Sequence, residues 1–433
     1  MSAKRKQAMR PADGRRYTRR LESLIDASKH LNTTFDLERL LALILHLATK
    51  NLAASRGTIY LIDKEKKELW SKVLKSDGPM EIRLALGTGI AGTVAVTGET
   101  VNLKDVRKDS RFFSGYDQRS GFRTRTMLCM PMRNRQGEII GVFQIINKKN
   151  GVFDHEDELF LEAFSEHAAL AIENARLYLA SLAHERMQKE LQIAADIQQR
   201  LLPKEVKDIH GYDVSAVARP CAEVGGDFYD VVPLDDHRNA FIMADVAGKG
   251  VPAALLVSGL HASLHVFLQG RQGLSDRLWL TDMMGRLNTL VFDNSPPEKF
   301  ITLFVLILDS LTHSATYVNA GHNPPCVIRA ADRSVQHLEA SGLPLGMLEN
   351  MTYEALEVTI APGDALLLYT DGVTECMNSR GEQYGEDRMH DVAMETPDIN
   401  PHSLRDRLLQ SVDAFAGGHS YADDLTLLIL KRT

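Results

Sequence analysis

Four short acidic motifs in the C-terminal half of the chain contain the side chains best suited to chemistry. They are Gly225–Asp230 (GGDFYD), Met243–Gly250 (MADVAGKG), Tyr369–Glu375 (YTDGVTE) and Ala422–Thr426 (ADDLT). Asp245 and Asp371 each follow an apolar segment that predicts a strand, at 240–244 and 365–370, and each precedes a glycine-containing turn. A carboxylate at that place projects from a rigid sheet edge, and glycine lets backbone carbonyls approach it.

Carboxylates gathered in this way repel one another unless cations lie between them. Oxygen ligands select Mg²⁺ or Mn²⁺, whereas a zinc site needs His or Cys, which these motifs do not contain. A divalent-cation centre is therefore the chemistry that the motifs indicate. His261 and His265 lie four residues apart on one face of the helix expected at 252–268, but the sequence offers no third ligand for them, so we expect packed helix histidines.

Composition narrows the class of protein. The chain has 433 residues, a length that predicts roughly two to four domains, and its net charge is −7. The first 20 residues are strongly basic, so the body is acidic, which argues against a nucleic-acid partner. The longest apolar run, 301–308, is far shorter than the roughly 20 residues of a membrane span. Four separated cysteines fit a reducing compartment, and we expect a cytoplasmic protein with no membrane partner.

The first block, 17–178, follows a basic tail (1–16) that we expect to be disordered, and it mixes helix and strand patterns. Helical periodicity is present at 21–31 and 37–52, and a closing helix is expected to begin near His155. Between them the pattern predicts strands at 56–62, 67–74, 80–84, 126–133 and 139–147. Helices around a central antiparallel sheet imply an α+β module.

The second block, 168–204, is one uninterrupted helical pattern that ends before Pro203. Its apolar positions step by three or four without a strict heptad, so local unwinding of a coiled coil is expected. We interpret it as a linker that forms a dimeric coiled coil; the alternative is a surface helix packed on its own domain.

Several motifs of the first block resemble those of GAF sensory domains, namely Gly87–Val94, Asn102–Val106, Met130–Met132 and Gly141–Lys148. The residues Asn147, Lys148, Phe153 and Asp157 match the NK…FxxxDE pattern of cyclic-nucleotide-binding members. The resemblance implies that these residues brace the pocket and do not hold the nucleotide. A cyclic nucleotide, another small ligand, or a domain used only for dimerisation remain alternatives.

The third block, 205–433, resembles the metal-dependent PPM (type 2C) Ser/Thr protein phosphatases, in their bacterial SpoIIE/RsbU-like branch. The four acidic motifs carry the resemblance, together with Asn319–Pro325 (NAGHNPP) and Ser341–Gly346 (SGLPLG). The family fold is an α-β-β-α sandwich with two or more Mn²⁺ or Mg²⁺ ions at one end.

The resemblance assigns the metal ligands by motif: Asp227, Asp245, the Val246 carbonyl, Asp371 and, from the last motif, Asp423 with Asp424 as second choice. Asp227, Asp245 and Asp371 are the residues expected to carry catalysis. Asp230 and Glu375 are either outer acids or face water. A bridging water activated by paired metals would attack phosphoserine or phosphothreonine in line.

The motif after Asp245 departs from eukaryotic members, which have a histidine proposed to protonate the leaving group. Ala247 occupies that place. Loss of a general acid typically costs about 10²–10⁴ in rate, so we expect a slow, protein-selective enzyme. The resemblance implies a phosphorylated anti-sigma-factor antagonist or a similar regulatory protein as substrate. The alternatives are a pseudophosphatase scaffold, or a cyclic-nucleotide receptor whose phosphatase is a passive output.

Overall fold

The computed structural model describes residues 35–433, apart from 76–77, 114–116, 118–121, 204–205, 207, 271–273, 297 and 396–398. The chain divides into two compact units, Met1–Arg186 and Met187–Thr433. The basic tail and the helix expected at 21–31 lie outside the described residues, as does the expected domain boundary at 204–205.

The first unit is built on a six-stranded antiparallel sheet of order β3-β2-β1-β6-β5-β4. Its strands are β1 (Ala54–Asp63), β2 (Glu68–Lys75), β3 (Gly78–Ala85), β4 (Val101–Leu103), β5 (Met127–Arg133) and β6 (Ile139–Lys148). The described helices before α5 are α2 (Leu37–Asn51), α3 (Gly89–Thr97) and the short 3₁₀ helix η1 (Val106–Lys108). The strands that the sequence predicts are therefore confirmed to within two residues.

The two faces of this sheet bury different helices. One face packs against α2 and the first turns of α5, with Ile44, Phe143 and Phe164 in a shared core. The other face packs against α3, with Val94 and Cys129 buried. Cys129 lies inside β5 and has no exposed surface, so it is a core residue.

Helix α5 (His155–Gln199) is 45 residues long and joins the closing helix of the first unit to the expected linker. Its sequence contains no Gly or Pro, which explains the lack of a break. The first turns bury Leu161, Phe164 and Ile172, whereas further along Met187 and Ile193 are exposed. The helix ends at Gln199, a few residues before the end that Pro203 predicts.

The second unit contains two five-stranded antiparallel sheets, of order β14-β11-β10-β9-β8 and β13-β12-β15-β16-β7. The strands are β7 (Tyr212–Arg219), β8 (Asp227–Pro233), β9 (Arg238–Val246), β10 (Ile301–Asp309), β11 (Ser314–Ala320), β12 (Cys326–Ile328), β13 (Val335–His337), β14 (Leu356–Thr359), β15 (Ala365–Tyr369) and β16 (Leu425–Arg432). The helices after α5 are α6 (Val251–Gln269), α7 (Asp276–Asn294), α8 (Asp371–Thr374), α9 (Gly385–Met394) and α10 (Pro401–Ala416).

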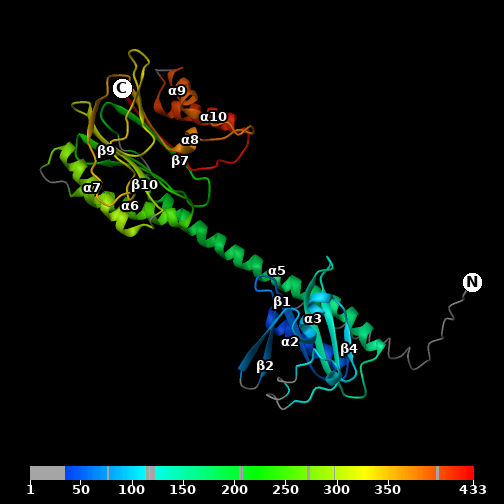
Figure 1. Cartoon of the computed structure of the whole chain (residues 1–433). Coiled ribbons are helices and arrows are strands. Elements are labelled where there is room, and N and C mark those ends of the chain that lie inside the picture. The colour runs from blue at the N-terminus through cyan, green and yellow to red at the C-terminus, as the bar shows by residue number, and fades with distance from the viewer. Residues whose placement is uncertain are drawn as a thin grey trace, which may run out of the picture. The chain divides into compact units, whose positions relative to one another are not determined.

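Three buried clusters show that these elements form four layers. Helices α6 and α7 cover the outer face of the β8–β11 sheet, as Figure 1 shows, through a core that includes Leu264 and Met284. Between the sheets, Phe241 and Phe304 face Leu366 and Leu428. Helices α9 and α10 cover the outer face of the second sheet. This is the α-β-β-α sandwich that the family resemblance implies.

Helix α6 corrects the expectation drawn from the run 301–308. Within the described residues, α6 is a helix whose length and apolar composition alone would suffice to cross a bilayer. One face of it, however, lies in the core of the sandwich, where Ala253, Val257, Leu260 and Leu264 are buried. This packing explains its apolar composition as that of a core helix.

Candidate metal centre

The first two acidic motifs meet on neighbouring strands. Asp227 of β8 lies directly opposite Asp245 of β9 in the antiparallel register. Such partners point to one face of the sheet with Cβ atoms about 4.5–5.5 Å apart, and like charges there destabilise the pair. Strand β9 continues through Val246, so Asp245 lies inside the strand and not after its end at Ala244 as expected.

The other two motifs reach the same end of the sandwich from the second sheet. Strands β15 and β16 pair, with Tyr369 opposite Leu427. Asp371 follows β15 and begins the short helix α8, where the sequence suggested only a turn. Asp423 and Asp424 immediately precede β16.

Two threonine hydroxyls tie the two sheets together at Asp227. Thr370 Oγ1 donates to Asp227 Oδ2 at 2.6 Å, and Thr426 Oγ1 donates to the same oxygen at 2.7 Å. Thr370 also accepts a hydrogen bond from the Thr426 backbone N–H at 3.0 Å. The Asp227 carboxylate is therefore held in one orientation, with its other oxygen left for a different partner.

The pKa values of the clustered acids show how poorly their charges are balanced. Burial, then repulsion from Asp245, raises the pKa of Asp227 well above its ordinary value, and the threonine hydroxyls offset part of this. Burial, followed by Asp371, Asp423 and Asp424, raises the pKa of Asp245 to about 7.

Burial, followed by the charges of Asp423 and Glu375, also raises the pKa of Asp371. The cation that acts against the rise at both Asp245 and Asp371 is Lys249. A cluster of oxygen donors with unbalanced charge fits divalent cations such as Mg²⁺ or Mn²⁺.

The adjacent acids Asp423 and Asp424 differ in what they contact. Asp424 is buried and accepts backbone N–H groups from Cys221 at 2.7 Å, Gly226 at 2.5 Å and Asp227 at 3.4 Å. Its oxygens are thus engaged in holding the GGD turn. The Asp423 side chain is 39% exposed and pairs with Lys249 at 2.9 Å.

The closeness of the backbones requires glycine at one motif position. A Cβ on Gly372 would lie 1.9 Å from the Asp424 carbonyl oxygen, which no side chain tolerates. The expectation that glycine in the turn after an acid lets a carbonyl approach therefore holds at Gly372, which follows Asp371. A Cβ on Gly226, which precedes Asp227, would lie 3.1 Å from the Val246 carbonyl oxygen, a tight contact.

The end of helix α5 also contacts this region. Gln198 Nε2 donates to the Gly225 carbonyl at 2.7 Å, and the Gly225 N–H donates back to Gln198 Oε1 at 3.0 Å. This paired contact holds the residue two positions before Asp227. Nothing in the sequence pattern of the linker singles out Gln198.

Other residues named from the sequence lie elsewhere. Asp230 is on the face of β8 opposite to Asp227 and contacts His265 at 2.7 Å and His261 at 3.9 Å. The expectation that the two histidines lack a third ligand group is therefore wrong, because a strand distant in sequence supplies one. Glu375 is exposed at the end of α8. His322, in the NAGHNPP motif, is buried and hydrogen-bonded to Thr302 at 2.9 Å.

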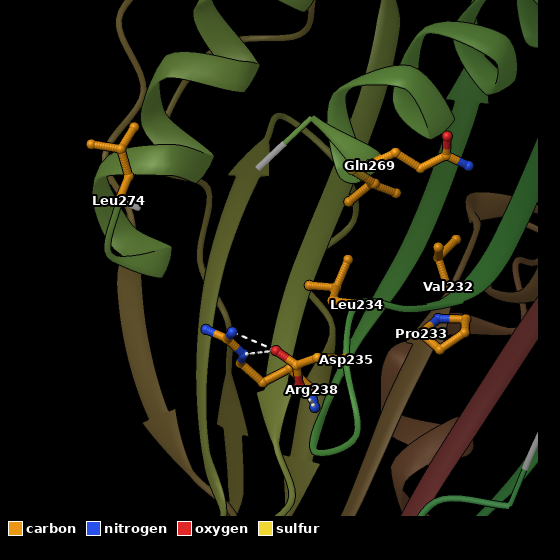
Figure 2. A pocket seen from close by; sticks show the side chains of 8 residues that line it. Val232, Pro233, Leu234, Asp235, Arg238, Gln269 and Leu274 are labelled. Atoms are coloured by element: carbon orange, nitrogen blue, oxygen red, sulfur yellow. Dashed lines mark hydrogen bonds and ion pairs between the residues drawn. The ribbon is translucent and has the colours of Figure 1, made fainter. Parts of the chain in front are cut away.

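A hollow of about 640 Å³ lies at the other end of β8, remote from the acids. Figure 2 shows Asp235 and Arg238 bonded across the β8–β9 turn, with Gln269 at the end of α6 and Leu274 before α7. Arg238 also pairs with Asp276 at 3.4 Å. Asp235 and Arg238, the charged residues that line the hollow, are thus already paired. The hollow shares no lining residue with the acidic motifs.

The GAF-like residues make polar contacts with neighbouring segments inside the first unit. The Asn147 side chain accepts from the Arg125 N–H at 2.7 Å and donates to the Arg123 carbonyl at 2.7 Å. Lys148 forms an ion pair with buried Asp157 and lies over the Phe153 ring, 5.9 Å from its centroid.

A cavity of about 2210 Å³ in the same unit is lined by residues that include Trp70, Arg111, Phe122 and Gln144. None of Asn147, Lys148, Phe153 and Asp157 is among the described residues that line it. These four residues therefore contact the surrounding fold and not the cavity.

The sequence did not point to several residues that the structure places at the acids. Thr370 directly precedes Asp371, and Thr426 follows Asp424 by two residues. A hydroxyl so close to a motif aspartate could have indicated their role. Lys249 lies within the second motif. Gln198 and Cys221 are brought in by the fold alone, from positions without any motif.

Comparison with known proteins is consistent with this geometry. The model of the SpoIIE family (stage II sporulation protein E) matches residues 235–433, and that of the GAF domain matches residues 36–172. The phosphoserine phosphatase RsbU of Bacillus subtilis is 31% identical over 255 residues, which cover 57% of this chain and 71% of RsbU.

Two further relatives share parts of the chain. The phosphoserine phosphatase RsbP of the same organism is 28% identical over 243 residues, 56% of this chain and 57% of RsbP. The dual 3′,5′-cyclic-AMP and -GMP phosphodiesterase 11A of Takifugu rubripes is 35% identical over 204 residues, 43% of this chain and 23% of that enzyme. The alignments thus cover widely different shares of these relatives.

Proposed function

This chain belongs to the SpoIIE-type family of serine/threonine phosphatases that includes RsbU, and we propose that it hydrolyses phosphoserine or phosphothreonine on a bacterial regulatory protein. The substrate we favour is an anti-sigma-factor antagonist or a protein of that kind. The GAF domain at its N-terminus regulates this activity.

The observation that carries the proposal is the meeting of four acids from four separate motifs at one end of the sandwich. Asp227 and Asp245 are register partners, and the charges of Asp371 and Asp423 raise the pKa of Asp245. A scaffold without turnover has no need to keep these carboxylates so close at the cost of mutual repulsion.

The roles we propose follow from the contacts of each residue. Asp227, Asp245, the Val246 carbonyl, Asp371 and Asp423 would hold the ions, which are Mn²⁺ or Mg²⁺. Asp424 instead fixes the GGD turn through backbone N–H groups, so we propose it as a positioning residue. Paired divalent ions supply an activated water and neutralise charge on phosphoryl oxygens.

The turn after Asp245 supports the proposal of a slow enzyme. Ala247 offers no proton donor, and its carbonyl accepts a hydrogen bond from Lys299 Nζ at 2.8 Å. Lys299 thus fixes the turn. The proton for the leaving serine must then come from water or from a group of the substrate protein.

We propose that the GAF domain acts through helix α5. This helix begins within the core of the first unit, and its other end holds Gly225 through Gln198. A rotation of the helix would move Gly225 and thereby the adjacent Gly226 and Asp227. Exposed Met187, Ile193 and Ile197 are the surface that we propose for a homodimeric coiled coil, in a cytoplasmic protein.

The test of the enzymatic proposal is hydrolysis of a phosphoserine protein by the full chain with Mn²⁺, with Asp371→Asn alongside. We expect turnover that needs the divalent ion and falls in the variant. Turnover by neither protein on any phosphorylated antagonist, while the substrate still binds, would favour the scaffold alternative.

A small ligand in the GAF domain is a second candidate function, favoured by the cavity of about 2210 Å³. That volume exceeds the roughly 300–1,000 Å³ of common ligand sites, so it has room for a nucleotide. Arg111 and Gln144 offer polar contacts, and Trp70 and Phe122 offer apolar ones. Calorimetric titration of the full chain with cAMP and with cGMP tests this candidate. Saturable heat with either nucleotide indicates a cyclic-nucleotide site, and its absence with both indicates another ligand.

A further inference from the structure

Helix α6 presents two imidazoles to a carboxylate on the strand beneath it. His261 and His265 are one helical turn apart, and their ring centroids are 4.4 Å from each other. Both Nε2 atoms approach Asp230 Oδ2, at 3.9 Å from His261 and 2.7 Å from His265. The three ligand atoms all lie within 4.8 Å of one another.

These separations are close to those of a tetrahedral metal site. Zn–N and Zn–O bonds of about 2.0–2.1 Å place neighbouring ligand atoms roughly 3.3 Å apart in a tetrahedron. The contact of His265 with Asp230, at 2.7 Å, is shorter than that value, and the contact of His261 with Asp230, at 3.9 Å, is longer, so the two contacts lie on either side of it.

The surroundings of the three groups favour a bound cation. The Asp230 side chain is 8% exposed, and that of His261 is 20% exposed. The other Asp230 oxygen accepts the Val231 N–H at 2.8 Å, which orients the carboxylate. The His261 ring packs edge-on against Phe228, 5.3 Å between centroids, which fixes the imidazole plane. Orientation of ligands by such neighbours is typical of metal sites.

The ligand set also distinguishes this group from the acidic centre. Two imidazoles and one carboxylate suit Zn²⁺, whereas clustered carboxylates suit Mg²⁺ or Mn²⁺. Asp230 points to the opposite face of β8 from Asp227. The His265 side chain is 35% exposed, so water can reach a fourth coordination position.

We propose that His261, His265 and Asp230 form a second metal site that binds Zn²⁺ and ties helix α6 to strand β8. Strand β8 begins with Asp227, and α6 begins five residues after Val246. A metal at this site fixes the position of the helix that follows the second acidic motif relative to the strand that carries the first.

Titration of the metal-free full chain with Co²⁺, in excess Mg²⁺ to fill the acidic centre, tests the proposal. We expect one Co²⁺ per chain with the visible absorption of four-coordinate cobalt, displaced by Zn²⁺. His261→Ala and His265→Ala should each weaken binding by at least the roughly 100-fold upper range seen for loss of an outer partner. His184→Ala, on the exposed part of α5, is the matched control and should bind as the parent does.

A Cys221→Ser background separates this site from the group of Cys221, Asp423 and Asp424, whose ligand atoms also lie within 4.8 Å of one another. The proposal requires the cobalt spectrum to persist in that background. It is overturned if the spectrum is absent in excess Mg²⁺, if it disappears with Cys221→Ser, or if it survives both histidine substitutions.

Thermal unfolding provides a second readout that is independent of phosphatase activity. Zn²⁺ should raise the melting temperature of the parent chain in excess Mg²⁺ and leave that of His265→Ala unchanged, because ligands stabilise the state that binds them. A far-ultraviolet circular dichroism spectrum of His265→Ala that matches that of the parent shows that this variant is folded. Equal Zn²⁺ stabilisation of both proteins overturns the proposal.

Discussion

Buried aspartates in the two units are balanced in opposite ways. In the first unit, Asp157 is fully buried and forms an ion pair with Lys148, whose side chain is 9% exposed. The positive charge comes from the same domain, and the backbone N–H of Asp154 adds a hydrogen bond at 3.0 Å.

The acids of the second unit have no comparable balance. Asp227 and Asp245 face each other across two strands, and Asp371 and Asp423 add further negative charge. Lys249 is 44% exposed and pairs with Asp423. The charge of Asp157 is balanced within the fold, whereas we propose that cations from solution balance the charges of the second group. Mutations at both places test this difference between a structural ion pair and a proposed metal centre.

Asp245→Asn should have the largest effect. Removing one ligand of the proposed ions costs several kcal/mol of transition-state stabilisation, so we expect turnover to fall roughly 10³–10⁴-fold. The melting temperature of the metal-free chain should stay the same or rise, because repulsion of Asp227 is relieved. Steady-state kinetics with Mn²⁺ and a thermal melt without it make the two measurements. Turnover within tenfold of the parent would contradict the comparison.

Lys148→Met should have the opposite signature. It removes the lysine from the buried ion pair with Asp157, and breaking a buried pair typically costs about 3–5 kcal/mol, so the unfolding free energy of the first unit should fall by that amount. Urea unfolding followed by a probe in that unit measures this change. Lys64→Met is the control, since the exposed pair of Lys64 with Glu138 should contribute less than about 1 kcal/mol. Equal losses of unfolding free energy in both variants would show that the buried pair stabilises the first unit no more than the exposed pair does.

Thr370→Val and Thr426→Val test whether the two hydroxyls hold the Asp227 carboxylate in position for metal binding. Each removes one hydroxyl donor to Asp227 Oδ2, so we expect the affinity for Mn²⁺ to fall roughly 10–100-fold. Calorimetric titration of Mn²⁺ into the metal-free chain gives the affinity. Thr359→Val, at an exposed position of β14, should bind Mn²⁺ as the parent does. Unchanged affinity in all three variants would remove the role assigned to the hydroxyls.

Gln198→Ala should have the smallest effect, a change in turnover of less than about tenfold. It removes both hydrogen bonds to Gly225, each worth about 0.5–1.5 kcal/mol, but leaves every proposed ligand in place. Exposed Gln199→Ala is the neighbouring control. Identical kinetics for the two variants would show that α5 does not act on the GGD turn through this residue.

The sequence predicted much of the fold because hydrophobic periodicity dominates it. Five of the described strands of the first unit, the helix at 252–268 and the beginning of α5 at His155 follow from local patterns, whereas the three-residue strand β4 was not predicted. The acids were identified by motif, and the structure brings Asp227, Asp245, Asp371 and Asp423 to one end of the sandwich. The distinction between Asp423 and Asp424 needed the backbone N–H groups of Cys221 and Gly226, about 200 residues away in sequence.

What could not be predicted depends on contacts between distant segments. Asp230 meets His261 and His265 because a helix covers that face of β8, and no local pattern places these groups together. Gln198 reaches Gly225 in the same way. Helix α8 at Asp371 is four residues long, so its sequence carries too little periodicity to tell it from a turn.

Anomalous diffraction from crystals of the full chain grown with Mn²⁺ would locate the ions of the proposed metal centre. We expect at least two manganese peaks among the carboxylates of Asp227, Asp245, Asp371 and Asp423, with Asp424 still bound to backbone N–H groups. An absence of manganese between these side chains, or ions held by Asp424 in place of Asp423, would contradict this expectation.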